Sequence, residues 1–357
     1  MKLKEIAHNV TKVTRAESDL WLLPSQLVAL EVEVENCRFG PKEKEKREPL
    51  LDFWTIENDG SLRNSGVELV SGPQYGMDLL EAISALETGL PPQVIWSLRT
   101  SVHVHLDVRE WNMDQLLAMI YMYIVLEYVL FSMSPNRRNN QYCVPWFCSG
   151  ATEVALVLHT LRKRGSLRDL NDALSTLYRY SACNLKAIQK FATVEFRHMH
   201  GTNNAMELVN WVNVLMGLIK VGNTCPSSYV LTCLSTTQTT LILLKHIYGP
   251  YYKLLSETED YAYNLNQGFK SLQNILFMLE EQFEKEADTS QVDIKEHSSY
   301  AMFRKKKLVP KIIATDESIF DEARIIIDDG ENNEDDDEDI REEEDRDNDD
   351  NGEGNDD

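Results

Sequence analysis

The sequence lacks the paired cysteines that would indicate a disulfide framework or a structural zinc site. Six cysteines are scattered over 357 residues with no Cys-x-x-Cys pair among them. We also expect no secretory leader at the N-terminus, so the thiols should stay reduced. These features predict a cytoplasmic protein, or one in the host cytoplasm if the gene is viral.

Basic residues are scarce. The chain holds 36 Lys and Arg against 58 Asp and Glu, a formal net charge of −22. Residues 328–357 contain 19 acidic residues and two arginines, which leaves −5 for the remainder. The remainder therefore shows no basic footprint for nucleic acid. The acidic segment has almost no apolar residues and is predicted to be a disordered tail that favours solubility, with a DNA mimic or a tether as alternatives.

The chain also lacks an uninterrupted membrane span and a convincing internal repeat. Residues 116–133 are nearly all apolar, but Glu127 interrupts them. Asn112 and Gln115 have the spacing of a capping box at the start of this run. The pattern predicts a buried core helix and no contact with a membrane.

Within the stretch from residue 99 to residue 109, polar and apolar residues alternate strictly from Ser101 onward. A period of two is that of an extended strand, whose side chains point to opposite faces in turn. One face carries only Val and Leu, and the other carries Ser101, His103, His105, Asp107 and Arg109.

Two further stretches have the same alternation. Residues 27–36 place Glu31, Glu33 and Glu35 between apolar residues, and residues 193–198 place Glu195 and Arg197 on one face. We predict that all three stretches are strands of one sheet. Carboxylates and imidazoles that converge from separate strands suit a hard divalent cation, and an arginine beside them suits a phosphate.

The other elements are predicted from turn and helix signals. Asp59-Gly60 indicates a hairpin between residues 51–57 and 66–71, with Glu68 either in the same cluster or in solvent. Residues 21–23 are expected as an edge strand and residues 41–49 as a solvated loop. Helical spacing predicts one helix that ends at Gly89 and others over 151–163, 167–179, 204–220, 228–247 and 255–286.

Six motifs occur in an order that resembles a known family. They are Glu31-Val-Glu33, Trp54 with Asp59-Gly-Ser-Leu62, Gly66-Val-Glu68-Leu-Val-Ser71, Thr100-Ser-Val-His103-Val-His105, the segment Arg138 to Tyr142, and Glu195-Phe-Arg197 with Gly201-Thr202. Over residues 25–220 the chain resembles the amidoligases found largely in phages and fungi. These belong to the carboxylate-amine ligase superfamily typified by glutamine synthetase and glutamate-cysteine ligase.

The resemblance implies an α+β fold in which an antiparallel sheet forms a half-barrel like the catalytic domain of glutamine synthetase, covered by helices. The concavity would hold ATP and two or three Mg²⁺ or Mn²⁺ ions. The implied reaction converts a carboxylate into an acyl phosphate, which an amine attacks to give an amide. The expected segments are 1–24, a catalytic domain 25–220, a helical extension 221–286, a linker 287–327 and the tail 328–357.

The resemblance also implies roles for individual residues. Glu31, Glu33 and His103 match metal ligands, and Glu68 matches a further ligand or an acid at the amine site that accepts its proton. Glu195 and Arg197 match the pair that holds the last metal and steadies the transferring phosphoryl group.

Other residues have two interpretations each. His105 and Asn140 are assigned to substrate binding and Arg138 to ATP, although His105 could sit in the core and the other two lie in a polar loop. Glu35 is either a ligand or solvent-exposed, and Trp54 fits the core better than an adenine stack. His198 and His200 are left out of the site because their face is opposite that of Arg197.

The sequence therefore favours an ATP-dependent, magnesium-requiring amide ligase. Its alternatives are a phosphotransferase like the guanidino kinases, which share this architecture, and a non-catalytic assembly protein on the same scaffold. The substrates would be a small-molecule or peptide carboxylate and an amine. The apolar helices after residue 204 leave homo-oligomer formation open.

Overall fold

The computed structural model describes residues 2–8, 26–39 and 44–290, which belong to one unit of the chain. The predicted edge strand at 21–23, the linker beyond residue 290 and the acidic tail lie outside the described residues.

A six-stranded antiparallel sheet carries the fold, and with the helices around it gives the predicted α+β class. The sheet is open, with strand order β2-β3-β1-β4-β6-β5. Three adjacent interior strands, β1, β4 and β6, are the three stretches with alternating polar residues. The half-barrel curvature stays a prediction. The strands are β1 (Val28–Val34), β2 (Trp54–Asn58), β3 (Val67–Ser71), β4 (Ser101–Asp107), β5 (Cys183–Asn184) and β6 (Thr193–His200).

The hairpin predicted around Asp59-Gly60 is present. β2 and β3 pair from Trp54 opposite Ser71 to Asn58 opposite Val67. The first arm starts later than expected because residues 44–51 form the helix α1 (Lys44–Leu51). The prediction of a solvated loop was therefore wrong from residue 44 onward. Lys, Glu and Arg are good helix formers, and the buried Leu50 anchors this helix to the core.

The remaining helices follow the predicted ones with several differences. The helix predicted over 255–286 begins only at Tyr261, after the separate short helix α11 (Tyr252–Ser256), and the helix predicted over 167–179 ends at Thr176. The predicted helix over 228–247 is divided in two, because Thr236 caps a new helix by accepting a hydrogen bond from the Thr239 amide. Gly89 is the last helical residue, and Leu90 takes the cap position in an extended conformation. The helices are α2 (Met77–Gly89), α3 (Met113–Ser132), α4 (Trp146–Ser149), α5 (Ala151–Arg162), α6 (Leu167–Thr176), α7 (Ala187–Phe191), α8 (Ala205–Thr224), α9 (Ser227–Cys233), α10 (Thr237–Tyr248), α11 (Tyr252–Ser256) and α12 (Tyr261–Ser290). Short 3-10 turns occupy Leu3–Glu5, Pro135–Arg137 and Gly249–Tyr251.

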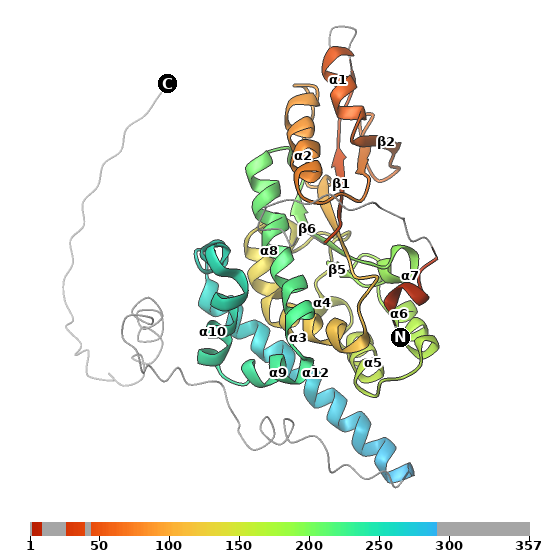
Figure 1. Cartoon of the computed structure of the whole chain (residues 1–357), viewed down its shortest axis with the longest axis vertical. Coiled ribbons are helices and arrows are strands. Elements are labelled where there is room, and N and C mark those ends of the chain that lie inside the picture. Colours follow the sequence, from red (N-terminus) through yellow and green to blue (C-terminus); the bar gives the residue numbers. More distant parts are fainter. Residues whose placement is uncertain (1, 9–25, 40–43, 291–357) are drawn as a thin grey trace, which may run out of the picture. The chain divides into compact units, whose positions relative to one another are not determined.

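The apolar helix α3 is the core helix that the sequence predicts. Asn112 caps it, accepting hydrogen bonds from the amides of Asp114 and Gln115, and Gln115 completes the capping box. α3 and α8 are both long and apolar enough to cross a membrane, but 83% and 67% of their apolar windows are buried inside the protein. α3 contacts α5, α8, α9 and α12, so helices on both sides of it cover its surface (Figure 1).

The apolar face of the sheet joins these helices in one hydrophobic core. Val32, Val104 and Phe196 on β1, β4 and β6 are fully buried. Trp54 belongs to this core too, since its indole N–H donates a 2.9 Å hydrogen bond to the Ala82 carbonyl on α2. The polar residues of the strands are therefore on the opposite face.

The acid that interrupts α3 connects the core to the loops beside that polar face. Glu127 is buried, and its Oε1 accepts hydrogen bonds of 2.7 Å from the Tyr123 hydroxyl and the Trp146 amide. Burial raises the pKa of Glu127 to about 7. The Tyr123 hydroxyl also lies 3.1 Å from Nε2 of His198 on β6. This network fixes the position of the first residues of α4.

The contact between α3 and α12 depends on a glycine. A Cβ atom at Gly268 of α12 would lie 1.9 Å from the Val125 carbonyl oxygen, which no side-chain rotation can relieve. We predict that Gly268→Ala lowers the free energy of unfolding by about 2–3 kcal/mol, because overpacking outweighs the gain in helix propensity. Urea unfolding followed by circular dichroism would measure this. Gly72→Ala is the control, since a Cβ there meets nothing within 4 Å, and equal stability of the two variants would contradict the prediction.

Candidate active site

The register of the central strands brings the predicted polar residues into rows. β1 lies between β3 and β4, and places Glu31 opposite His103 and Glu33 opposite Glu68. One strand further, His105 lies opposite Glu195 on β6. Directly opposed residues of an antiparallel pair have neighbouring side chains on the same face. Residues far apart in sequence are thereby collected on one face of the sheet.

An irregularity in β6 ends this row. Val104 lies opposite Phe196 and Val102 opposite Met199, so Arg197 and His198 together face the single residue His103. This is the pattern of a β-bulge. The Arg197 amide donates instead to the Ala182 carbonyl at 2.8 Å.

The two bulge residues point to opposite faces. The Arg197 side chain lies on the polar face, whereas His198 is fully buried among aromatic rings of the core. Burial lowers the pKa of His198 to about 3, so it is a neutral core residue. His200 contacts Ser134 and does not line the cavity described next.

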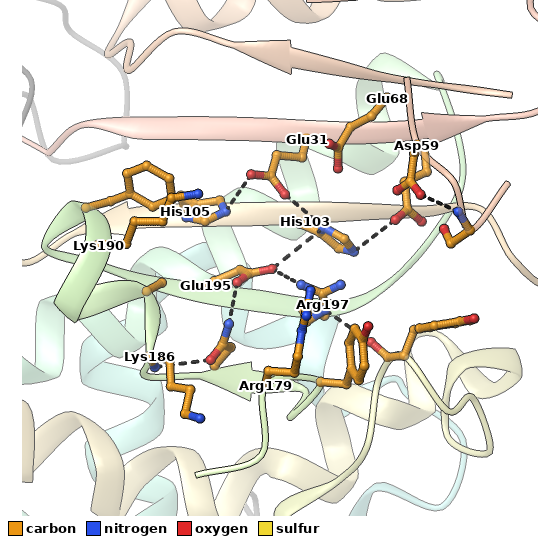
Figure 2. Close-up of a pocket in the computed structure, with 17 residues that line it drawn as sticks. Glu31, Asp59, Glu68, His103, His105, Arg179, Lys186, Lys190, Glu195 and Arg197 are labelled. Atoms are coloured by element: carbon orange, nitrogen blue, oxygen red, sulfur yellow. Dashed lines mark hydrogen bonds and ion pairs between the residues drawn. The ribbon is translucent and has the colours of Figure 1, made fainter. Parts of the chain in front are cut away.

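The polar face lines a cavity of about 430 Å³, a volume typical of small-molecule sites. Its walls come from β1, β3, β4 and β6, from the β2–β3 turn and from residues 179–191 (Figure 2). Its charged lining consists of Glu31, Glu33, Asp59, Glu68 and Glu195 against His103, His105, Arg179, Lys186, Lys190 and Arg197.

Two imidazoles share the carboxylate of Glu31. Its Oε2 lies 3.0 Å from Nδ1 of His103, and its Oε1 lies 3.1 Å from Nε2 of His105. The other nitrogen of His105 contacts the Thr193 hydroxyl at 3.0 Å. Burial opposes ionisation of Glu31, but the two histidines outweigh it and hold the pKa of this carboxyl far below its usual range. Burial also works against the charge of His105, yet Glu31 and Glu195 raise its pKa.

Glu195 is held from two sides. Asn184 on β5 donates to its Oε2 at 2.7 Å, and the Arg197 guanidinium pairs with its Oε1. Arg197 also donates through Nε to the Tyr142 carbonyl at 3.1 Å. Despite burial, the Arg197 charge keeps the pKa of Glu195 below its usual value. These contacts fix the carboxylate and the guanidinium side by side.

The carboxylates crowd together at the other end of the cavity. Single oxygens of Glu33, Asp59 and Glu68 lie within 4.8 Å of one another. Ser101 donates its hydroxyl proton to Glu33. Burial, followed by the repulsion of neighbouring carboxylates, raises the pKa of Glu68 to about 8. At neutral pH Glu68 therefore keeps its proton, because it is partly buried beside other carboxylates.

Three groups of side chains in the described residues can hold a metal ion. Each offers ligand atoms within 4.8 Å of one another: Glu31 with His105 and Glu195, Glu31 with Glu68 and His103, and Glu33 with Asp59 and Glu68. These donors are mainly carboxylate oxygens with some imidazole nitrogens and no thiolate, a set that suits Mg²⁺ or Mn²⁺. The proton kept by Glu68 is a further sign that the donor set fits a divalent cation.

Most residues predicted from the sequence lie in this cavity, and a few lie elsewhere. Glu31, Glu33, Glu68, His103, His105, Glu195 and Arg197 all line it. Glu35 is buried away from it and accepts a hydrogen bond from the Arg63 amide at 2.9 Å, so it is not exposed to solvent.

Arg138 and Asn140 are not among the lining residues either. The Arg138 guanidinium packs over the rings of Tyr128 and Phe147, and Asn140 donates to the Leu98 carbonyl at 2.6 Å. Their assignment to nucleotide and substrate stays a prediction that this geometry does not favour.

Several lining residues were not predicted as site residues. Asp59 was identified only as a turn residue, although its place in the family motif was a usable signal. Arg179, Lys186 and Lys190 lie in loops and in the short helix α7, where no period reveals which way a side chain points.

Fold and site together define an α+β protein whose sheet carries acidic and imidazole side chains in a cavity suited to divalent cations. The chain belongs to the family described as "Putative amidoligase enzyme", whose family model matches residues 4–219. The family is one of ligases, so membership makes this chain an enzyme of that class and suggests that it uses a nucleotide and a metal. A comparison with curated proteins finds no match.

Cation binding should displace the proton held by Glu68. With a pKa of about 8 this carboxyl is mostly protonated at pH 7, and a cation requires the ionised form. We therefore expect Mn²⁺ affinity to rise with pH and level off above about 8, with release of about one proton from Glu68 at pH 7. Calorimetry in two buffers of different ionisation enthalpy measures that proton. Glu68→Gln should abolish its release and Glu81→Gln, on the exposed face of α2, should not; unchanged release in Glu68→Gln would place the proton elsewhere.

Proposed function

We propose that the protein is an ATP-dependent ligase that joins a carboxylate to an amine through an acyl phosphate, with Mg²⁺ or Mn²⁺ as cofactor. One observation carries this proposal. Three groups of potential cation ligands share a single cavity with an arginine held in place by a buried carboxylate. Phosphoryl transfer needs mainly positioning and neutralisation of charge, and these are the parts that supply both.

The three ligand groups overlap. Glu31 with His105 and Glu195 would hold a cation near Arg197, and Glu33 with Asp59 and Glu68 would hold one at the crowded acidic end. Glu31 with His103 and Glu68 form the third group, which shares one residue with each of the others. Bound ions would neutralise the phosphate oxygens of ATP and of the phosphorylated carboxylate. Glu31 contacts both histidines and belongs to two of the three groups, so it would keep their rings oriented toward the bound cations.

Arg197 is the group that would stabilise the transferring phosphoryl. Its guanidinium is fixed by Glu195 and by the Tyr142 carbonyl, so little side-chain entropy is lost when it meets a phosphate. A preorganised cation favours the transition state because it needs no rearrangement as charge shifts.

Glu68 would serve the incoming amine. An amine reaches the site as an ammonium ion, which the acidic end of the cavity attracts, and it must lose a proton before it can attack an acyl phosphate. Once a cation has displaced its proton, Glu68 is an ionised carboxylate at this end of the cavity and can accept the proton of the ammonium. Glu68 therefore combines a place among the ligands with the role of proton acceptor.

Binding of Mg²⁺ and ATP tests the proposal directly. We expect calorimetric titration of ATP to give a signal that requires Mg²⁺ and disappears with EDTA. Glu31→Gln and Arg197→Ala should each weaken binding by about tenfold or more, because each removes a charge that faces the phosphates or their ions. Glu257→Gln and Arg168→Ala, which alter exposed ion pairs outside the cavity, are matched controls.

Product analysis separates the ligase from the phosphotransferase. A ligase should release ADP and phosphate only when a carboxylate and an amine are both present, and should form an amide. A stable phosphoramidate would identify a guanidino-kinase-like transferase instead. Well-folded protein that binds no Mg²⁺ and ATP would exclude both enzymes.

A further inference from the structure

Three cations in the cavity have no carboxylate partner among the residues that the structure describes. Arg179, Lys186 and Lys190 all line it and all belong to one twelve-residue segment, 179–190. Within the part of the chain that the structure describes, none of the three forms an ion pair with a carboxylate. Arg197, by contrast, is paired with Glu195. In a cavity with five carboxylates, three unpaired cations indicate that this side is arranged to receive negative charge from a ligand.

Ring contacts orient two of these cations without neutralising them, and a backbone hydrogen bond holds the main chain of the third. The Lys190 ammonium lies 4.4 Å from the centre of the Phe191 ring, and the Arg179 guanidinium lies 4.7 Å from that of Tyr180. Contact with a ring face orients a cation and leaves its charge available. The Lys186 backbone amide donates to the Asn184 side chain at 3.1 Å, and Asn184 in turn holds Glu195. The basic segment is thereby attached to the centre of the site.

The charges divide the cavity into two ends. In Figure 2, Glu68 and Asp59 lie at one end, and Lys190, Lys186 and Arg179 lie on the other side of Glu195. In the proposed function, the phosphates of ATP are neutralised by divalent ions at the carboxylates and by Arg197. The reacting carboxylate also lies at that centre. The positive charge of segment 179–190 is therefore additional to the charge that neutralises ATP and the reacting carboxylate.

We propose that the carboxylate substrate carries a second anionic group, and that Lys186 and Lys190, with Arg179, bind it. The substrate class is then a dicarboxylate, or a carboxylate with another acidic group. This inference rests on the proposed function and specifies its substrate. A monocarboxylic acid would leave these cations without an anionic partner in the complex, and would bind less well for that reason.

A pair of matched ligands tests this inference. Glutarate and pentanoate have the same chain length and differ by one carboxylate. We expect calorimetry on the full chain, with Mg²⁺ and a non-hydrolysable ATP analogue present, to show glutarate binding about tenfold tighter than pentanoate. In the double variant Lys186→Gln with Lys190→Gln, this ratio should fall close to one, while the affinity for the ATP analogue changes by less than about twofold.

Lys245→Gln is the matched control. Its ammonium also lies over a ring, 5.7 Å from the centre of Tyr252, but it does not line the cavity. The inference is overturned if wild-type protein binds both acids equally, or if the double variant retains the preference. It is also overturned if the double variant loses the ATP analogue, since the lysines would then bind phosphates. If the wild-type protein binds no nucleotide at all, this result would instead contradict the proposed function.

Discussion

The register of β1 between β3 and β4 is the constraint on which the rest of the site depends. It sets Glu31 against His103 and Glu33 against Glu68, so that carboxylates and imidazoles from four strands share one face. A slip of one residue would turn Glu31 and Glu33 into the core and expose their valine neighbours. The burial of those valines therefore fixes the register. Packing on the apolar face of the sheet thereby determines which side chains meet on the polar face.

The alternating stretches could be read from the sequence because a strand with one buried face imposes a period of two. That period identified β1, β4 and β6 and most of the residues on their polar faces. Capping signals located α3 in the same way. The charged run at 44–49 was mistaken for a loop because helix propensity and solvent exposure favour the same residues there.

The rest of the cavity could not be predicted because it is built from segments without a period. Asp59 lies in a turn, and residues 179–190 form loops and a short helix whose side chains point where tertiary packing directs them. The opposite holds for Arg138 and Asn140, which are polar residues of a promising loop. Their contacts are with the protein itself, so polarity in a loop does not distinguish a ligand contact from a structural one.

The bulge in β6 has a consequence for sequence comparison. Arg197 and His198 occupy the space of one residue opposite His103, and the strand resumes its alternation only at Met199. Removing one residue here would restore a regular ladder and would leave Phe196 opposite Val104 and Met199 opposite Val102, on the faces that they occupy now. A family member with a one-residue gap at this point would thus have lost either the arginine of the site or the histidine of the core. The length of this strand, as well as its composition, can therefore separate relatives that retain the site from those that keep only the fold.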